Sequence, residues 1–270
     1  MFGFIISEKQ EIPLSDNCLY TTVSGINNRD ELFDALSSGF RFPDYFGRNW
    51  NALSECMRDL EWIEEDAVIV YHDNLSDMSI QDFDMYVSVL VDTMYSWLYL
   101  PARRGIKTVD FRLCFHPSLK KRLEEAISHY LVSSRMYAFG LAQKNELPII
   151  DDTLYIRVPK VDGNVELLDV IYKQLGLPET IERSWDVLKA HIGYSEHRLY
   201  QAIFLYNDDL SNISDLDFKT YSTLLLDVAY DWLHPSLYND KTMDFRAFFS
   251  PTNKFRLQKT IIQHLIIADQ

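Results

Sequence analysis

The chain has 270 residues, a length typical of one large domain or of two ordinary ones. Its formal net charge is −14, from 26 basic and 40 acidic residues, which argues against a nucleic-acid partner because a phosphate backbone requires a basic surface. An acidic surface suits a basic protein partner, although many proteins are acidic for solubility alone.

The cysteines and the apolar stretches indicate where the protein resides. Cys18, Cys56 and Cys114 form neither a disulfide framework nor a metal-binding spacing, which is typical of a reducing compartment. The start of the chain lacks the basic residues and the cleavage site of a signal peptide. The longest apolar stretch, residues 86–100, is too short to cross a bilayer. We therefore expect a cytoplasmic protein without membrane contact.

Apolar periodicity predicts strands and helices in alternation along the first half of the chain. Strands separated by helices imply parallel pairing with right-handed crossovers. The expected elements are a strand at 18–23, helices at 30–36 and 50–60, a strand at 67–71, a helix at 80–98, a strand at 108–115 and a helix at 118–131.

Residues 42–60 combine an aromatic loop with the start of a helix. Pro43 fixes its own φ, and Gly47 can adopt a positive φ without strain. Asn49 is a plausible helix cap, because its side chain can accept from the first free backbone N–H groups. The loop aromatics Tyr45 and Phe46 either meet a partner or simply plug the end of the sheet.

The helix that follows has two distinct faces at a spacing of about 100° per residue. One face is expected to be buried, and the other holds two carboxylates that belong either to a binding surface or to an ordinary solvated face. The buried face carries Trp50, Leu53, Cys56, Met57 and Leu60, and the exposed face carries Asn51, Glu55, Arg58 and Asp59.

The second half of the chain repeats the first at a shift of 135 residues. Between residues 43 and 97, 18 of 55 positions are identical to those of 178–232 without a gap. This identity indicates a tandem duplication. The repeated elements are expected at 154–158, 165–175, 185–192, 202–206, 216–233, 242–249 and 252–267.

The signature of residues 45–53, Tyr-Phe-Gly-Arg-Asn-Trp-Asn-Ala-Leu followed by Glu55, resembles that of the barstar family, small protein inhibitors of the ribonuclease barnase. The resemblance implies a three-stranded parallel sheet packed with helices. It also implies that this loop and helix enter the active site of an enzyme, where acidic side chains meet phosphate-binding arginines. Asn51 stands where the family usually has Asp.

The two copies agree in their apolar positions and differ at the loop. Thr180 and Ile181 replace the aromatic pair, and Ala190 replaces Glu55. We therefore expect the first unit to bind the partner and the second to support it or to add a separate contact. The opposite assignment stays open because Asp186 restores the acidic residue that the first copy lacks.

These observations predict an α/β protein of two tandem barstar-like units, at residues 1–140 and 141–270, joined between 134 and 152. Each unit is expected to contain a small three-stranded parallel sheet packed with helices, plus a C-terminal helix. The signature lies at 42–60, and its degenerate counterpart lies at 177–195.

The expected function is that of an immunity protein, which binds and occludes the active site of a cognate bacterial toxin. A basic ribonuclease or other nuclease is the expected partner, with the carboxylates imitating the phosphates of its substrate. The residues expected to bind it are Asp44, Tyr45, Phe46, Gly47, Asn49, Asn51, Glu55 and Asp59.

No motif points to catalysis, a cofactor, a metal ion or a small-molecule substrate. The sequence lacks a Gly-x-Ser-x-Gly motif, a P-loop and a dinucleotide fingerprint, and its seven histidines show no spacing typical of ligands. Two alternatives remain, a non-inhibitory interaction scaffold and an uncharacterised enzyme. The acids retained in both long helices, Asp82 and Asp217 among them, are more simply structural.

Overall fold

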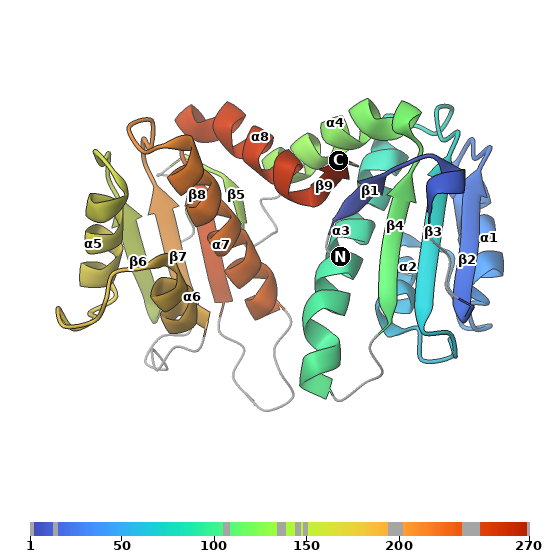
Figure 1. Cartoon of the computed structure of the whole chain (residues 1–270), viewed down its shortest axis with the longest axis horizontal. Helices are drawn as coiled ribbons and strands as arrows, with labels where there is room; N and C mark the ends of the chain where they lie inside the picture. Colours follow the sequence, from blue (N-terminus) through green and yellow to red (C-terminus); the bar gives the residue numbers. More distant parts are fainter. Residues whose placement is uncertain are drawn as a thin grey trace. The chain divides into compact units, whose positions relative to one another are not determined.

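The computed structural model describes residues 3–12, 16–104, 109–133, 139–143, 147, 151–193, 202–233 and 244–268. The chain divides into two compact units, one of Met1–Tyr130 with Ile262–Gln270 and one of Leu131–Ile261. Each unit has a wholly parallel sheet packed with helices (Figure 1), so the predicted α/β class and parallel pairing are confirmed.

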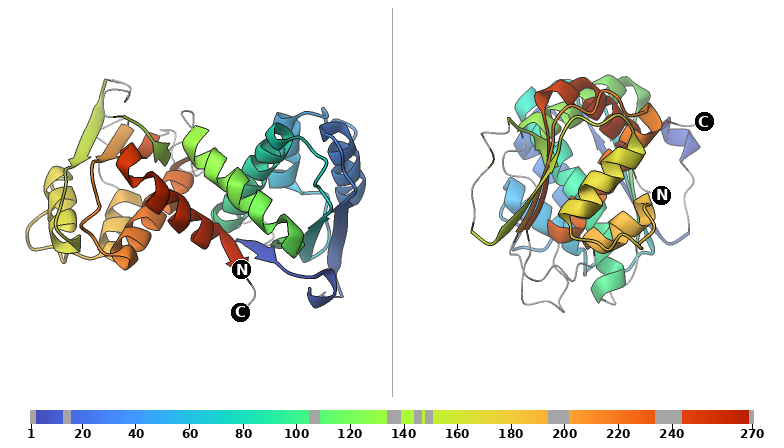
Figure 2. Two further views of the ribbon diagram at one scale, coloured as in Figure 1. Left: turned by 90° about the horizontal axis from the view of Figure 1, so that it is seen from above. Right: turned by 90° about the vertical axis from the view of Figure 1, so that its left-hand side faces the viewer.

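The first unit contains a five-stranded sheet in the order β2-β3-β4-β1-β9. Helices α1, α2 and α3 lie on one face of this sheet (Figures 1 and 2). The elements of this unit are β1 (Phe4–Ile6), β2 (Cys18–Ser24), α1 (Arg29–Phe40), α2 (Trp50–Asp59), β3 (Ala67–Asp73), α3 (Ile80–Arg104), β4 (Asp110–Phe115), α4 (Lys120–Ser133) and β9 (Ile266–Ala268).

The two faces of the first sheet are covered in different ways. Every residue of β3 up to His72 is buried, as expected of a central parallel strand with a continuous apolar run. On the face opposite the three helices, Ile12 packs on Ile69, Tyr71 and Cys114, so the segment before β2 covers part of the sheet. The helices cover the other face, and the loop that contains Tyr45 and Phe46 connects α1 to α2.

The second unit contains a four-stranded sheet in the order β5-β8-β7-β6. Helices α5, α6 and α7 follow its strands in the order that α1, α2 and α3 follow those of the first. The elements are β5 (Phe139–Leu141), β6 (Thr153–Val158), α5 (Asn164–Gln174), α6 (Trp185–Gly193), β7 (Ala202–Asn207), α7 (Asp215–Leu233), β8 (Asp244–Phe249) and α8 (Lys254–Leu265).

Strands β1, β5 and β9 were not predicted, so each sheet has more than the three expected strands. Phe4 of β1 pairs with Leu113, and Phe139 of β5 pairs with Ala247. Phe139 lies 135 residues after Phe4, so the same strand occurs at the same place in both units. Three residues are too few to show an alternation, which is why the sequence did not reveal them.

The C-terminal strand β9 corrects one prediction. Residues 266 and 267 were expected to end a helix, but residues 266–268 form a strand that pairs with β1, with Ile266 opposite Phe4. The structure thereby places the end of the chain in the first unit. Most of the predicted join at 134–152 lies outside the described residues.

Candidate functional site

The loop before α2 is fixed by contacts to α1. The backbone N–H of Phe46 donates to the carbonyl of Pro43 at 2.9 Å, closing a turn. Arg48, from the end of the loop, forms an ion pair with Asp34 of α1. The Arg48 side chain holds the loop against α1, and its partner was missed by the sequence reasoning. Asp169 stands 135 residues after Asp34, and this repetition is the signal that could have revealed it.

The left-handed residue of this loop is Arg48, not Gly47 as the sequence suggested. Arg48 has φ 48°, whereas Gly47 is absent from the positive-φ residues of the described chain. A Cβ at Gly47 would lie 3.0 Å from the side-chain nitrogen of Asn49, so a larger residue there would make this side chain shift. Arg48 adopts a strained conformation that its ion pair can hold in place.

The two loop aromatics lie in different surroundings. Phe46 is half-buried and contacts Phe33 at 5.9 Å and Phe42 at 4.9 Å between ring centroids, both edge-on. Trp50 also packs edge-on against Phe33, at 5.0 Å. Tyr45, in contrast, is 70% exposed. Phe46 therefore helps to build the loop, and only Tyr45 presents a large aromatic surface to solvent.

Helix α2 has the predicted cap and the predicted buried face. The side chain of Asn49 accepts a hydrogen bond of 3.0 Å from the backbone N–H of Ala52. Leu53, Cys56 and Met57 are buried, Trp50 is half-buried, and Leu60 is buried just after the helix ends. Burial raises the pKa of the Cys56 thiol. The apolar stripe fixes the rotation of the helix about its axis, and hence the direction of its other face.

The exposed face of α2 presents Asn51, Glu55 and Asp59 to solvent. Among the described residues, neither carboxylate has an ion pair or a side-chain hydrogen bond. The pKa of the Tyr45 phenol is raised, mainly by partial desolvation and secondly by the negative charge of Asp59. The loop thus places an exposed aromatic ring beside an exposed carboxylate that no cation of the described chain neutralises.

Asp44, the remaining predicted binding residue, is exposed in the same loop. The acidic run that follows α2 is only partly free. Glu65 forms an ion pair of 2.5 Å with Arg41, and Asp66 accepts a hydrogen bond of 2.8 Å from Asn17. Glu61 is exposed and adds to the negative field at Tyr45.

Negative charge is concentrated in the first unit. Counted over the sequence, this unit has 12 basic and 22 acidic residues, a formal charge of −10. The second unit has 14 basic and 18 acidic residues, a formal charge of −4. A cationic partner would therefore be attracted mainly to the first unit.

The equivalent loop of the second unit has the same backbone contacts. The N–H of Ile181 donates to the carbonyl of Pro178 at 3.1 Å, and Arg183 forms an ion pair with Asp169 of α5. The hydroxyl of Ser184 accepts a hydrogen bond of 3.3 Å from a backbone N–H in the first turn of α6. The turn, the ion pair and the cap are thus present in both units.

The surface of the second loop and helix is different. Thr180 and Ala190 are exposed where the first unit has Tyr45 and Glu55, and neither offers an aromatic ring or a charge. Asp186 is the one acid of the first turn of α6, and it is exposed. This helix therefore presents a single carboxylate where α2 presents two.

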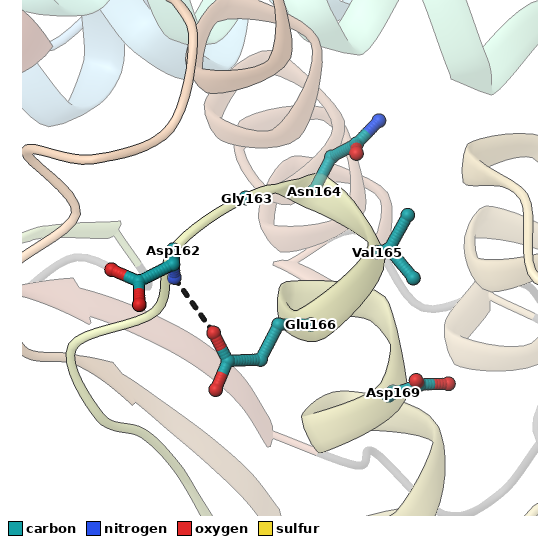
Figure 3. Close-up of a pocket in the computed structure, with 6 residues that line it drawn as sticks. All are labelled: Asp162, Gly163, Asn164, Val165, Glu166 and Asp169. Carbon is teal, nitrogen blue, oxygen red and sulfur yellow. Dashed lines mark hydrogen bonds between the residues drawn. The ribbon is translucent and has the colours of Figure 1, made fainter.

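A shallow hollow lies at the start of α5 in the second unit (Figure 3). Its acidic groups help to hold the start of this helix in place. Glu166 accepts a hydrogen bond of 2.7 Å from the backbone N–H of Asp162, and Asp169 is paired with Arg183. The residues that line the hollow are Asp162, Gly163, Asn164, Val165, Glu166 and Asp169.

The described chain offers neither a metal site nor a membrane-spanning helix. Across the described ranges, no three His, Cys, Asp or Glu side chains gather where they would hold a metal ion. In the same parts of the chain, each helix is too short or too polar to span a bilayer. Asp82 and Asp217, the acids retained in both long helices, each accept a hydrogen bond from the serine just before the helix, at 2.8 and 2.6 Å.

Comparison with protein families matches residues 17–115 to the family described as Barstar (barnase inhibitor). The match extends from the residue before β2 to the end of β4, and so includes the loop and α2. Neither the curated proteins nor the solved structures gave a match. The match covers 99 of the 270 residues, and the family is described as an inhibitor of barnase.

Proposed function

We propose that this protein is an inhibitor whose first unit binds and occludes the active site of a cognate bacterial toxin, a ribonuclease or other nuclease, and that it acts as the immunity protein in the cytoplasm. The observation that carries the proposal is the outward face of α2, where Glu55 and Asp59 have no partner among the described residues. The family match of residues 17–115 supports it.

The mechanism follows from the chemistry of that face. A nuclease holds phosphates with arginine and lysine side chains, and carboxylates at Glu55 and Asp59 engage the same cations. The amide of Asn51 adds a neutral hydrogen bond beside them. Tyr45 provides the apolar anchor that enters the substrate cleft, since aromatic side chains dominate the energetics of interfaces.

The other residues of the surface act by holding it. Phe46 packs into the aromatic cluster behind the loop, and Asn49 fixes the start of α2. Gly47 allows the cap residue to approach closely. Asp44 contributes charge at the edge. Because this loop is fixed before binding, little conformational entropy is lost when the partner docks.

Electrostatic attraction brings the partner to this surface. The first unit carries −10 of the formal charge of −14, so a basic enzyme approaches it preferentially. Barstar and barnase are themselves a standard example of such steering, which shows as an association rate that falls with salt. We assign the same behaviour to this chain.

The second unit supports the first in this proposal. We place the two barstar-like units at 1–140 and 141–270, as copies of which only the first retains the binding surface. A truncation near residue 140 tests this. It also removes the edge strand β9 from the first sheet, and the first half alone is still expected to bind. Asp186 would carry a second contact if the second half also bound.

The test combines charge reversal with a matched control. Nucleases encoded in the same genome, and barnase as a first probe, are assayed for inhibition by the wild type, by Glu55→Lys with Asp59→Lys, and by Asp186→Lys. The double variant should weaken binding by about 30-fold or more, since the loss of interfacial charge pairs costs about 2 kcal/mol or more. Asp186→Lys should bind as the wild type does.

The outcomes separate the candidates. If the double variant binds and protects unchanged, the phosphate-mimicry mechanism is wrong. If the chain binds none of these nucleases, and a protein that co-purifies with it has no catalytic activity, the chain is an interaction scaffold instead. Turnover of a substrate by the isolated chain would favour an enzyme.

A further inference from the structure

Three of the most exposed large apolar side chains of the described residues lie in the second unit. Val165 is 68% exposed, Leu216 is 73% exposed and Phe255 is 83% exposed. They begin α5, α7 and α8, the three helices that follow strands β6, β7 and β8. In a parallel sheet these strand ends share one edge, so the three helices begin at the same end of the unit (Figure 1).

Hydrogen bonds show that the three helix starts adjoin. The side chain of Asn164, next to Val165, donates to Asp217 of α7 at 3.1 Å. Arg256 of α8 donates to Asp215 of α7 at 3.0 Å. Leu216 lies between those two acids in the sequence. Val165, Leu216 and Phe255 are therefore exposed at adjoining helix starts, and we call these three residues the helix-start patch.

The fold does not require this patch, because the first unit has polar residues at the same positions. Asp30, Gln81 and Lys121 occupy the places of the three apolar side chains, and all are exposed. Lys121 forms an ion pair of 3.8 Å with Glu125, as on an ordinary solvated helix. In the second unit, Lys259 takes the place of that glutamate.

The charges around the helix-start patch are divided between its two sides. The side formed by α8 is basic, and the side formed by α5 and α7 is acidic. Such a division is self-complementary about a two-fold axis, since each basic side then meets an acidic one. Arg256 and Asp215 are already paired with each other within the chain. The remaining basic side chains of α8 are Lys254 and Lys259, and the acidic ones without an ion pair among the described residues are Asp162, Glu166 and Asp217.

We propose that the helix-start patch is a homodimer interface, in which Phe255 of each copy packs between Val165 and Leu216 of the other. The shallow hollow beside Val165 receives the ring (Figure 3). A Cβ added at Gly163 in this hollow would meet nothing within 4 Å, so the space is open to an incoming group. A second copy supplies both the apolar ring and the opposite charge.

The net charge of the chain restricts where copies can meet. Contact between two first units would bring together surfaces of −10 each, whereas the second unit carries only −4. Three apolar side chains per copy are few for a standard interface of about 1,600 Å², so we expect a weak dimer that dissociates on dilution. The inference is independent of the proposed function, because it uses a different unit.

The test is sedimentation equilibrium of the full chain from about 1 to 100 μM at low salt. The average mass should rise from 31.7 kDa toward twice that value. Phe255→Lys and Leu216→Gln, which introduce the residues of the first unit, should each raise the dimer dissociation constant at least about tenfold. Ile80→Asp is the control, because it removes an exposed apolar residue of the first unit and should leave the dimer unchanged.

Two results would overturn the inference. A wild type that remains monomeric throughout this range would assign the patch to a different protein. A Phe255→Lys chain that dimerises as the wild type does would place the interface elsewhere. Inhibition of the toxin should persist in Phe255→Lys, which separates this interface from the proposed binding surface on α2.

Discussion

The loop and helix at residues 42–59 and their counterparts at 178–193 share a backbone but not a surface. Both loops close the same turn and pair an arginine with an aspartate on the preceding helix. Only the first carries an exposed tyrosine and two exposed acids on the following helix. The comparison separates the residues that build this element from those that would meet a partner.

Each unit also contains a buried polar bridge between a strand and a helix, and the residue at its centre differs between the two units. In the first unit His72 lies between the hydroxyl of Tyr86 and the carbonyl of Cys114, each at 2.8 Å. In the second, Asn207 accepts from Tyr221 at 2.7 Å and donates to a carbonyl at 3.1 Å. A neutral histidine and an asparagine thus offer the same donor and acceptor, but only histidine titrates near neutral pH.

The largest effect on stability is expected from the residues that the two units share. Leu53 and Leu188 are both fully buried on the apolar stripes of α2 and α6. Leu53→Ala and Leu188→Ala should each lower the free energy of unfolding of their own unit by about 2–5 kcal/mol, through lost burial and a residual cavity. Hydrogen exchange read by mass spectrometry reports each unit separately.

A similar loss in both units would support a common framework. If Leu188→Ala left the second unit unaffected, α6 would not be packed as α2 is. The affinity for the partner can be measured as well. Leu53→Ala should weaken it by disturbing α2, whereas Leu188→Ala should leave it unchanged.

The next effect distinguishes the two buried bridges by pH. Burial lowers the pKa of His72 to about 4, from 6.5 in the unfolded chain. The unfolded state therefore binds a proton first as pH falls, so stability is complete above pH 6.5 and decreases between 6.5 and 4. The loss in the first unit should be about 2 kcal/mol by pH 5 and about 3 kcal/mol below pH 4.

His72→Asn should remove this pH dependence. The variant copies the bridge of the second unit and costs some stability at neutral pH, because the ring of Phe115 stacks on the imidazole at 4.0 Å. The measurement is the free energy of unfolding of the first unit at pH 7.5 and pH 5, with carboxylate titration common to both proteins. An equal loss in wild type and variant would show that His72 is not responsible.

The long helices and strands could be predicted from the sequence, whereas the shortest strands could not. The continuous apolar run of β3 and the stripe of α2 predicted both elements within two residues. The three-residue strands β1 and β5 gave no readable period, and the last strand was assigned to a helix because it follows α8 without a break. Pairing across the sheet, which the sequence does not display, decides such short segments.

The candidate site was predictable in its exposed half. The helical period placed Glu55 and Asp59 outward, and the structure has them there. The interior of the loop was not predictable, because the conformation of Arg48 depends on an ion pair with a distant helix. The separate surroundings of Tyr45 and Phe46 likewise follow from tertiary packing rather than from the dipeptide.

A smaller effect is expected at the helix caps. Asn49→Ala and Ser184→Ala each remove the side chain that accepts from a backbone N–H of the first turn. Each should cost about 1 kcal/mol in its own unit. Asn49→Ser, which introduces the cap of the second unit, should cost less. Caps with unequal contributions would show that the two loops enter their helices differently.

The smallest effect on stability belongs to Tyr45, and the comparison is sharpest there. Tyr45→Thr introduces the residue of the second unit at a side chain that is 70% exposed, so the free energy of unfolding should change by no more than about 0.5 kcal/mol. If Tyr45 is the anchor in the toxin, affinity should fall about 30-fold or more, as at other buried aromatic anchors of interfaces. Calorimetric titration measures the affinity, and Thr180→Ala serves as the control. Unchanged affinity in Tyr45→Thr would leave the acids of α2 as the whole of the binding surface, and the aromatic ring would then be a feature of the loop alone.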